Sequence, residues 1–317
     1  MSKKVVITDY EFPNVDQEKD MLKKLGFEVD AGQCKTEDEV IELSRGAEGV
    51  FVQWAPVTGK VIGNLKNCKI IVRYGIGVDN VDLEVAKKKG IAVCNVPDYA
   101  LQEVADHALS LALALGRQIT EIDKLMRRGI WKFPPPLSLP PFREMTFTTM
   151  GYGRIAREVI KRAKAFGFKT AAFDPFIQPE IMKANGVVPV GKEEAFRGAD
   201  ILSLHLPLND ETYHVINRES FKQMKKSAIL INTARGGLID TEALIEALQD
   251  NKIAAAGLDV YEKEPLPGNY QLMEFKNVIL TSHCAWYSSS AITSLQYKAT
   301  QEMIRGLNGE KLKNKIV

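Results

Sequence analysis

The stretch Thr146-Phe-Thr-Thr-Met-Gly-Tyr-Gly-Arg-Ile-Ala156 decides the fold, because it combines a short strand, a tight glycine turn and the start of a helix. Gly151 and Gly153 would let the backbone approach a pyrophosphate at the helix N-terminus, and Ala156 would keep helix and strand close. Asp174 ends the next expected strand, 174 − 153 = 21 residues after the second glycine. A carboxylate there would bind a ribose 2′-hydroxyl and repel a 2′-phosphate. The segment favours NAD as the ligand, and an ordinary turn aspartate is the alternative.

Short apolar runs alternate with helix-like stretches on both sides of this segment. The alternation is typical of parallel sheets covered by helices. We therefore expect an α/β protein with two doubly wound parallel-sheet domains, joined by one long helix over residues 102–128. The expected strands lie at 4–8, 49–53, 69–73, 91–94, 169–173, 200–204, 228–232, 254–258 and 278–281.

Composition excludes several classes of function. The 317 residues are 45% hydrophobic, which is enough to bury two cores. The net charge is 42 − 40 = +2 without a basic stripe, so nucleic acid is a poor partner. No apolar run approaches the roughly 20 residues of a membrane span, and the first residues read as a strand rather than a signal peptide. We therefore expect a cytoplasmic protein that does not bind membranes.

The four cysteines are scattered and form no Cys-x-x-Cys pair, and no histidine stands at metal-ligand spacing from them. We therefore expect neither disulfides nor a metal site. Cys68 and Cys94 adjoin apolar runs and should be buried. Cys284 adjoins His283 and should line a pocket.

Three apolar runs in the last third of the chain are each followed by one reactive side chain, namely Arg235, Glu264 and His283. If these runs are neighbouring strands, a guanidinium, a carboxylate and an imidazole converge. Such a set fits a 2-oxo acid: the arginine holds the carboxylate and polarises the ketone, the histidine protonates its oxygen, and the glutamate orients and charges the histidine. Alternatively, Arg235 caps a strand end and Glu264 is a solvated loop carboxylate like Glu262.

The other three histidines fit the acid role less well. His107 lies on the expected long helix and could be a surface or interface residue, His205 ends a strand near the expected cofactor, and His214 follows a polar loop. Only His283 ends a strand with a glutamate candidate behind it. The alternative for His283 is a core histidine with satisfied hydrogen bonds.

Several phrases together carry a resemblance to a known family. They are Ile70-Ile-Val-Arg-Tyr-Gly-Ile-Gly-Val-Asp-Asn80, Val93-Cys-Asn-Val-Pro-Asp-Tyr99, Arg162-Ala-Lys-Ala-Phe-Gly-Phe168, Asn232-Thr-Ala-Arg-Gly-Gly-Leu238 and His283-Cys-Ala-Trp-Tyr-Ser288. With them the chain resembles the D-2-hydroxyacid dehydrogenase family over essentially its whole length, and most closely its C-terminal-binding-protein branch. The resemblance implies a discontinuous, flavodoxin-like substrate domain of residues 1–99 and 288–317, a Rossmann NAD-binding domain of residues 100–287, and a cleft between them.

The resemblance also implies roles for individual residues. Arg235, Glu264 and His283 match the catalytic positions. The cofactor-binding set is Gly151, Tyr152, Gly153, Arg154, Ile155, Asp174, Pro207, Thr212, Thr233, Ala234, Asp259, His283 and Ala285. The substrate-binding set is Arg73, Tyr74, Gly75, Ile76, Gly77 and Trp286.

The expected protein is an NAD-dependent enzyme that interconverts a 2-oxo acid and an (R)-2-hydroxy acid by hydride transfer. The resemblance places a two-fold interface on the long helix, so a homodimer is expected. One alternative is an NAD-responsive dimeric binding protein that recognises peptides, a role also found in the C-terminal-binding branch. Another is a phosphoglycerate-type dehydrogenase, which would need extra cations for the phosphate.

Residues 142–150 depart from the family pattern. Members usually carry Gly-Lys-Thr and an unbroken aliphatic strand before the glycine turn, whereas this chain has Arg143-Glu-Met-Thr-Phe-Thr-Thr-Met150. Threonines in a strand that is covered on both faces should weaken the core or be satisfied by local hydrogen bonds, and cofactor affinity should be affected most. The proline-rich stretch at 133–141 should be an extended connector.

Overall fold

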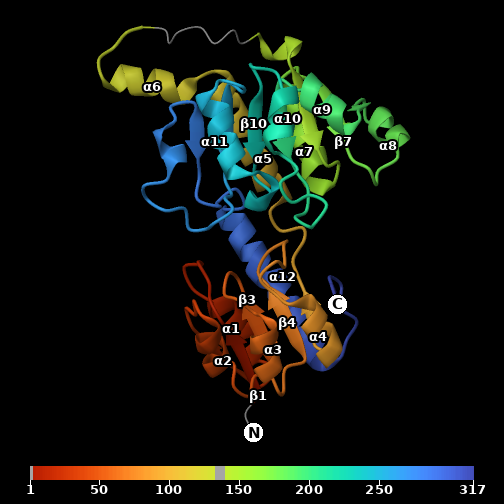
Figure 1. Cartoon of the computed structure of the whole chain (residues 1–317). Helices are drawn as coiled ribbons and strands as arrows, with labels where there is room; N and C mark the ends of the chain where they lie inside the picture. The colour runs from red at the N-terminus through yellow and green to blue at the C-terminus, as the bar shows by residue number, and fades with distance from the viewer. Residues whose placement is uncertain (1–2, 133–139) are drawn as a thin grey trace. The chain divides into compact units, whose positions relative to one another are not determined.

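The computed structural model describes residues 3–132 and 140–317. The chain forms two compact units (Figure 1). Unit 1 consists of Met1–Tyr99 and Ser288–Val317, and unit 2 of Ala100–Tyr287. Most of the proline-rich stretch predicted to be a connector, residues 133–139, lies outside the described residues.

Unit 1 is built on a five-stranded parallel sheet in the order β2-β1-β3-β4-β5. This order is that of flavodoxin-like doubly wound folds. The helix α12 comes from the far end of the chain and packs against α1 and β4. The strands are β1 (Lys3–Ile7), β2 (Phe27–Ala31), β3 (Gly49–Val52), β4 (Ile70–Arg73) and β5 (Ala92–Cys94), and the helices are α1 (Asp16–Lys23), α2 (Glu37–Leu43), α3 (Gly59–Asn64), α4 (Leu83–Lys89) and α12 (Ser289–Asn308).

Glycine and one buried carboxylate hold α12 on this sheet. A Cβ at Gly306 would lie 2.3 Å from Cδ1 of Ile70, so only glycine lets the helix approach β4 this closely. Glu18 is fully buried and accepts hydrogen bonds from Tyr74 Oη at 2.9 Å and from Gln296 Nε2 at 3.0 and 3.1 Å. Burial raises the pKa of Glu18 above its ordinary value. These bonds connect α1, α12 and the loop that follows β4.

Unit 2 is built on a seven-stranded parallel sheet in the order β12-β11-β10-β9-β6-β7-β8. Its strands are β6 (Thr146–Met150), β7 (Lys169–Phe173), β8 (Val188–Pro189), β9 (Ile201–Leu204), β10 (Ile229–Asn232), β11 (Ala255–Leu258) and β12 (Val278–Leu280), and its helices are α5 (Leu101–Gly116), α6 (Ile119–Arg127), α7 (Arg154–Ala165), α8 (Pro179–Ala184), α9 (Lys192–Gly198), α10 (Arg218–Gln223) and α11 (Thr241–Gln249). Short 3-10 turns lie at Phe142–Glu144, Gly236–Leu238 and Gln271–Glu274.

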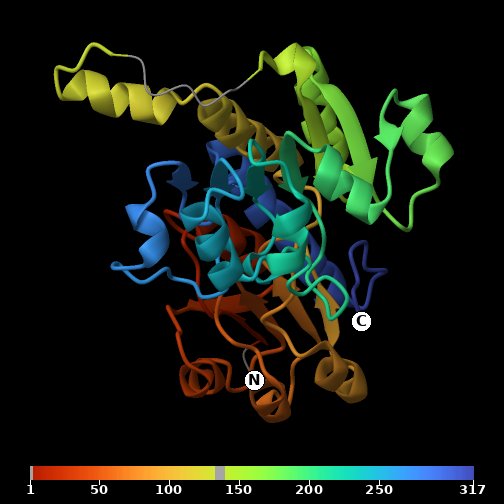
Figure 2. The ribbon, with the colours of Figure 1, turned by 45° about the horizontal axis from the view of Figure 1, so that its top comes forward.

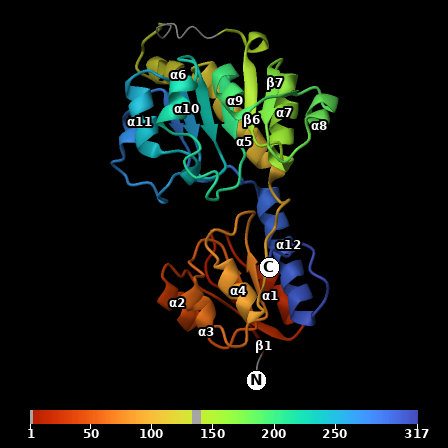
Figure 3. The same cartoon turned by 45° about the vertical axis from the view of Figure 1, so that its right-hand side comes forward.

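The seven-stranded sheet is buried on both faces. Helices α5 and α7 cover one face, and α9, α10 and α11 the other (Figure 3). Ile229 and Ile231 pack with the first group of helices, whereas Leu230 between them packs with the second. Successive side chains of a strand point to opposite faces, so these continuous apolar runs require helices on both sides. The strand order is the Rossmann arrangement, extended by one strand beyond β11. The predicted class of two parallel-sheet α/β domains is confirmed.

The prediction of one helix over residues 102–128 is wrong. The chain forms α5 and α6 instead, because Gln118 adopts a left-handed conformation with φ 53° that no α-helix continues. Before the break, Gly116 lies against the ring of Phe142, where a Cβ would come within 2.9 Å of Cε1. None of the described residues of α6 is buried, and Figure 2 shows this helix extending away from the sheet of its unit.

The unusual threonines of β6 are buried in the middle of the sheet. Thr148 is 1% and Thr149 0% exposed, and β6 pairs with β7 on one side and β9 on the other. Thr149 Oγ1 has no hydrogen-bond partner among the described residues. Local hydrogen bonds therefore do not satisfy Thr149, and a buried hydroxyl without a partner should cost stability.

Among residues 3–132 and 140–317, no helix has the length and apolar character needed to cross a membrane.

Candidate active site

The three runs that precede Arg235, Glu264 and His283 are neighbouring strands. β10 pairs with β11, and β11 pairs with β12, in parallel. The carboxyl ends of parallel strands meet at one edge of a sheet, and ligands of open α/β sheets bind outside that edge. The loops that carry the guanidinium, the carboxylate and the imidazole therefore begin side by side.

His283 and Glu264 form a hydrogen-bonded pair. His283 Nδ1 lies 2.7 Å from Glu264 Oε2, and the backbone N–H of Tyr261 donates to Glu264 Oε1 at 2.9 Å. Burial alone would raise the pKa of Glu264, but the hydrogen bond and charge of His283, the Tyr261 N–H and the charge of Arg235 together lower it below its ordinary value. Glu264 is therefore ionised at neutral pH, and Arg235 is close enough to contribute.

The loop of Arg235 is held against the Tyr261 segment by close backbone approach. A Cβ at Gly236 would lie 1.9 Å from the carbonyl carbon of Tyr261, so glycine is required there. Asn232 fixes the same loop, since its Nδ2 donates to the Arg235 carbonyl at 2.8 Å and its Oδ1 accepts from the Ala234 N–H at 3.0 Å. Arg235 and Glu264 are thereby kept on adjacent loops.

Asp259 organises the backbone around His283. Its carboxylate is 1% exposed and accepts hydrogen bonds from Thr281 Oγ1 at 2.5 Å, the Cys284 N–H at 3.0 Å and the Ala285 N–H at 2.9 Å. The His283 N–H donates to the Asp259 carbonyl at 2.8 Å. These bonds hold His283 in a left-handed conformation with φ 52°. The structure thus brings Asp259 together with Ala285, whereas Thr281 was missed by sequence reasoning.

His107 is a second residue that sequence reasoning missed. Its Nε2 lies 3.0 Å from Thr281 Oγ1 and 3.7 Å from Asp259 Oδ1. The partly buried ring therefore faces the carboxyl edge of the sheet, and the suggested surface or interface role stays a prediction. Helical position alone could not indicate this contact, since 174 residues separate His107 from Thr281.

The glycine turn has the space and the hydrogen-bond donors that a pyrophosphate needs. Gly151 has φ +94°, and a Cβ there would lie 2.4 Å from the His205 carbonyl oxygen. No described atom lies within 4 Å of the position a Cβ would take at Gly153, which precedes α7. None of the described side chains caps α7, so its first N–H groups remain available to an anion.

Asp174 lies at the same turn. Its Oδ2 accepts from the Tyr152 N–H at 2.8 Å and its Oδ1 from the Phe176 N–H at 2.9 Å. Tyr152 itself is buried, with the guanidinium of Arg157 5.0 Å from its ring centroid. Arg154 and Ile155 are the first two residues of α7.

The remaining predicted cofactor residues lie on the loops after β9 and β10. Thr212 Oγ1 donates to the Pro207 carbonyl at 2.6 Å, so the structure brings these two together. Thr233 and Ala234 follow β10 directly. Thr233 is 8% exposed, and its Oγ1 has no hydrogen-bond partner among the described residues. Thr233 lies at the carboxyl edge of the sheet, as the glycine turn does, and its hydroxyl without a partner would suit a polar ligand there. The residues at this edge therefore suit a dinucleotide.

The predicted substrate-binding residues lie in different units. Trp286 belongs to unit 2, is 8% exposed and donates from Nε1 to the His283 carbonyl at 3.0 Å. Arg73, Tyr74, Gly75, Ile76 and Gly77 belong to unit 1, at the end of β4. Gly75 has φ +138°, and the guanidinium of Arg73 fills the space that a side chain there would take. That guanidinium lies 5.3 Å from the ring centroid of Trp54.

The other histidines have different surroundings. Burial lowers the pKa of His205 to about 4, and its Nε2 lies 2.8 Å from Ser203 Oγ, so this ring stays neutral. His214 Nε2 lies 2.6 Å from Glu262 Oε1, and Glu262 Oε2 accepts from the Thr241 N–H at 3.0 Å. Glu262 is an exposed loop carboxylate, as described from the sequence, and it is also paired with His214. This second histidine–glutamate pair joins residues 48 apart in sequence.

All four cysteines are free thiols. Cys68 and Cys94 are buried as predicted, and burial raises the pKa of each to about 12. Cys284 is half-buried, and its Sγ lies 3.7 Å from Asp259 Oδ1.

Comparison with known proteins identifies the class. Residues 109–285 match the model of the family described as "D-isomer specific 2-hydroxyacid dehydrogenase, NAD binding domain". The chain belongs to the D-isomer specific 2-hydroxyacid dehydrogenase family, and unit 2 contains its NAD-binding domain. The family resemblance inferred from the sequence is thereby confirmed, whereas its C-terminal-binding-protein branch stays a prediction.

Three similar proteins illustrate the relationship. D-3-phosphoglycerate dehydrogenase of Methanocaldococcus jannaschii is 37% identical over 99% of this chain, which spans only 59% of that protein. Hydroxypyruvate reductase of Thermotoga maritima is 38% identical over 90% of this chain and 93% of its own length. The crystal structure of D-lactate dehydrogenase from Aquifex aeolicus, complexed with NAD and lactic acid, has a TM-score of 0.88 and 28% identity over 96% of both chains.

Proposed function

We propose that this protein is an NAD-dependent oxidoreductase that interconverts a 2-oxo acid and an (R)-2-hydroxy acid by hydride transfer. The observation that carries the proposal is the 2.7 Å contact between His283 and Glu264, with the charge of Arg235 acting on the same carboxylate. A proton donor, its orienting carboxylate and a guanidinium are the groups that reduction of an oxo acid needs. The hydroxypyruvate reductase and the D-lactate dehydrogenase among the similar proteins support this activity.

Each residue of the set has a separate task. Bound NADH would supply the hydride that reaches the carbonyl carbon. Arg235 would bind the substrate carboxylate through two parallel hydrogen bonds and polarise the carbonyl. His283 would donate the proton to the developing alkoxide from Nε2, because its Nδ1 already bonds Glu264. The ionised Glu264 would fix the ring orientation and stabilise the charged imidazole.

We propose that the cofactor is held by the predicted set around Gly151, Gly153 and Asp174, with Thr233 and Asp259 on the neighbouring loops. The open space at Gly153 and the uncapped start of α7 suit the pyrophosphate. The Asp174 carboxylate, at the end of β7, suits a ribose hydroxyl and disfavours a 2′-phosphate. The orphaned Thr233 hydroxyl gives the cofactor a further polar contact.

Two alternative functions predict different results in an assay with oxo acids. A phosphoglycerate-type activity has the support of the Methanocaldococcus relative and of Arg73 as a cation in the predicted substrate loop. A dimeric NAD-responsive binding protein of the C-terminal-binding type would hold the same cofactor with little turnover. Both alternatives leave the cofactor assignment unchanged.

Oxidation of NADH in the presence of glyoxylate, hydroxypyruvate, pyruvate or phosphohydroxypyruvate tests the proposal. Turnover of an unphosphorylated oxo acid to the (R)-hydroxy acid is the expected result. Preference for the phosphorylated substrate would favour the phosphoglycerate-type activity. Tight NADH binding without turnover of any of them would favour the binding protein.

We further propose a homodimer in which α6 contributes to the interface. The apolar side chains of Ile119, Ile122 and Met126 on this helix are 55%, 38% and 45% exposed, and an exposed apolar stripe on a helix suits a protein–protein interface. Light scattering at micromolar concentration should give the mass of a dimer, and Ile122→Glu with Met126→Glu should give a monomer. A monomer in the unmodified protein would contradict the proposal.

We also propose that the protein acts in the cytoplasm. The support is that all four cysteines are free, as is usual in a reducing compartment. Fractionation of the source cells, with immunodetection in the cytosolic fraction, tests this location.

A further inference from the structure

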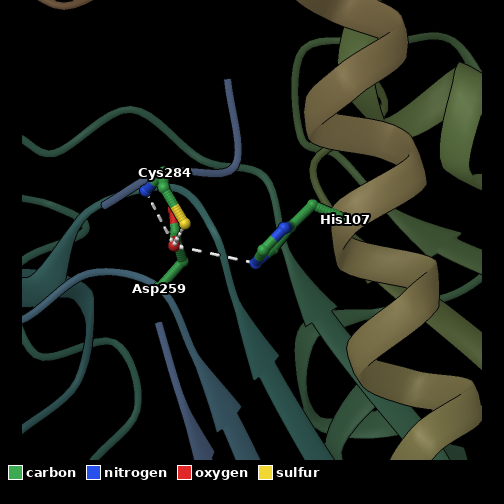
Figure 4. A group of neighbouring side chains, drawn as sticks. All are labelled: His107, Asp259 and Cys284. Atoms are coloured by element: carbon green, nitrogen blue, oxygen red, sulfur yellow. Dashed lines mark hydrogen bonds and ion pairs between the residues drawn. The ribbon is translucent and has the colours of Figure 1, made fainter. Parts of the chain in front are cut away.

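Three side chains of the types that bind metal ions meet in unit 2, at the loops that follow β11 and β12. They are His107, Asp259 and Cys284, whose donor atoms all lie within 4.8 Å of one another (Figure 4). Figure 4 shows the imidazole of α5 pointing toward the carboxylate and the thiol, which come from the loops after β11 and β12. Because the three lie far apart in sequence, ligand spacing along the chain could not reveal them.

The distances suit one small divalent ion. Asp259 Oδ1 lies 3.7 Å from His107 Nε2 and 3.7 Å from Cys284 Sγ. A tetrahedral zinc ion with ordinary bond lengths separates neighbouring donor atoms by about 3.4 to 3.6 Å. Shifts of a few tenths of an ångström would bring both distances into this range. Rotation of the Cys284 side chain can adjust the remaining distance, between His107 Nε2 and Cys284 Sγ, which is at most 4.8 Å.

The donor types select the kind of metal. Imidazole, carboxylate and thiolate together suit Zn²⁺ and similar borderline ions, whereas Mg²⁺ and Ca²⁺ require oxygen donors throughout. Asp259 is buried and fixed by Thr281 Oγ1 and the Ala285 N–H. His107 and Cys284 are only partly buried, which gives an ion access from solvent.

Binding of a metal ion would move one proton within His107 and release another from Cys284. Thr281 has a single hydroxyl proton and donates it to Asp259 Oδ1, so His107 Nε2 must donate to Thr281 Oγ1. An ion at this site would take the Nε2 lone pair, with the ring proton moving to Nδ1 and the bond to Thr281 breaking. The thiol of Cys284 would release its proton to solvent as the sulfur–metal bond forms.

We propose that His107 Nε2, Asp259 Oδ1 and Cys284 Sγ bind one Zn²⁺ ion, and that the ion excludes NAD(H) by occupying Asp259. The exclusion rests on the proposed function, in which Asp259 belongs to the cofactor site. The ion therefore acts as an inhibitor of this enzyme, and a fourth coordination position is left to water.

Titration of the cofactor-free protein with Co²⁺, a spectroscopic substitute for Zn²⁺, tests the site itself. One Co²⁺ per chain should give a thiolate-to-cobalt charge-transfer band in the near ultraviolet. The band should be absent in Cys284→Ser, weakened in His107→Gln and unchanged in Cys34→Ser, since Cys34 lies in unit 1. Absence of the band in the unmodified protein, or its persistence in Cys284→Ser, overturns the site.

Alkylation of the cysteines tests the same site in the unmodified protein, so the result does not depend on whether the variants fold. In the unmodified protein, Zn²⁺ should protect Cys284 from iodoacetamide while Cys34 continues to react, as peptide mass spectrometry would measure. Equal reaction of Cys284 with and without Zn²⁺ overturns the proposal.

Fluorescence titration with NADH tests the exclusion separately. Zn²⁺ at ten times its dissociation constant should weaken NADH binding by about tenfold, as competition requires, and should leave the Kd of Cys284→Ser unchanged. A cobalt band together with unchanged NADH affinity overturns the exclusion. A cobalt band in a protein that binds no NADH even without metal would contradict the proposed function and support the metal site.

Discussion

Two histidine–glutamate pairs lie on loops of unit 2 and have nearly the same length, although His283 bonds through Nδ1 and His214 through Nε2. His283 and Glu264 are 2.7 Å apart, His214 and Glu262 are 2.6 Å apart, and both histidines have a left-handed backbone, with φ 52° and 50°. In both pairs, burial would raise the pKa of the glutamate, but hydrogen bonds and the histidine charge lower it. The length of the pair and the backbone conformation of the histidine therefore do not by themselves identify a proton donor.

The surroundings of the two pairs differ. The ring of His214 stacks on Tyr213 at 3.9 Å, and the second oxygen of Glu262 accepts from the Thr241 N–H. Glu264 also accepts a backbone N–H, but Arg235 contributes to its electrostatics and His283 follows β12 at the carboxyl edge of the sheet. The neighbouring guanidinium and the position at the strand ends therefore suit the His283 pair to the proposed proton transfer.

The largest effect should come from removing the guanidinium that distinguishes the two pairs. Arg235→Met should lower kcat/KM for an accepted oxo acid by about 10³-fold or more, because it removes both carboxylate binding and polarisation of the carbonyl. Steady-state kinetics would measure the change. Arg218→Met is the matched control: Arg218 pairs with Glu246 on the surface, and its loss should leave kcat/KM within about twofold. Similar losses in both variants would contradict the role of Arg235.

Replacing each glutamate in turn by glutamine should give variants with different pH profiles of kcat. The lowered pKa of Glu264 means that its charge persists below the ordinary carboxyl range and is lost as the pH falls through the lowered value. Glu264→Gln has no charge at any pH and so cannot stabilise the positive charge of the proton-donating imidazole. Reduction at neutral pH should be about tenfold slower than in the unmodified protein, and the two rates should converge as the pH falls through the lowered pKa of Glu264, where the unmodified protein loses the same charge.

Glu262→Gln is the control for this change, and its pH profile of kcat should match that of the unmodified protein. A Glu264→Gln profile that is lowered equally at every pH would show that Glu264 acts on folding or binding instead.

A change away from both pairs should alter cofactor choice. The unmodified protein should prefer NADH over NADPH by about an order of magnitude, and Asp174→Ala should narrow the ratio of the two kcat/KM values. Asp174→Asn sharpens the test, because an amide can still accept from the Tyr152 N–H but no longer repels a 2′-phosphate. Equal use of both cofactors by the unmodified protein would refute the assignment.

The smallest effect should be a gain in stability at β6, far in sequence from both pairs. Thr149→Val should stabilise unit 2 by about 1 kcal/mol, because it replaces a buried hydroxyl without a partner by a methyl group of the same shape. Thr300→Val should have the opposite sign, since Thr300 is buried and donates to the Gln296 carbonyl at 2.7 Å. Urea unfolding measures the change in the free energy of unfolding for each variant. A loss of stability in Thr149→Val would contradict this account of the strand.

Much of the fold could be predicted because its strands are continuous apolar runs between turns. β3, β4, β9 and β10 are buried along their whole length, and each was expected from sequence. β2 was missed because it is an edge strand, in which Glu28 and Asp30 interrupt the apolar residues. The break at Gln118 was missed because the apolar periodicity continues from α5 into α6 across it.

The residues of the candidate site and its surroundings likewise divide into those that the sequence could predict and those that it could not. Arg235, Glu264 and His283 could be predicted because each follows a recognisable strand, and neighbouring parallel strands end at one edge. The contacts of His107 with Thr281 and of His214 with Glu262 join residues 174 and 48 apart, on elements whose pairing local sequence does not encode. Such contacts depend on tertiary packing, so only the structure reveals them.

The steady-state kcat of His283→Gln and His214→Gln, on one accepted oxo acid with NADH, tests the central claim most directly. If His283 donates the proton, its substitution should lower kcat by about 10²-fold or more, the range that general acid catalysis supplies, while NADH affinity stays nearly unchanged. His214→Gln should remain within about twofold of the unmodified protein. Near-normal turnover by His283→Gln, or an equal loss in His214→Gln, would contradict the account.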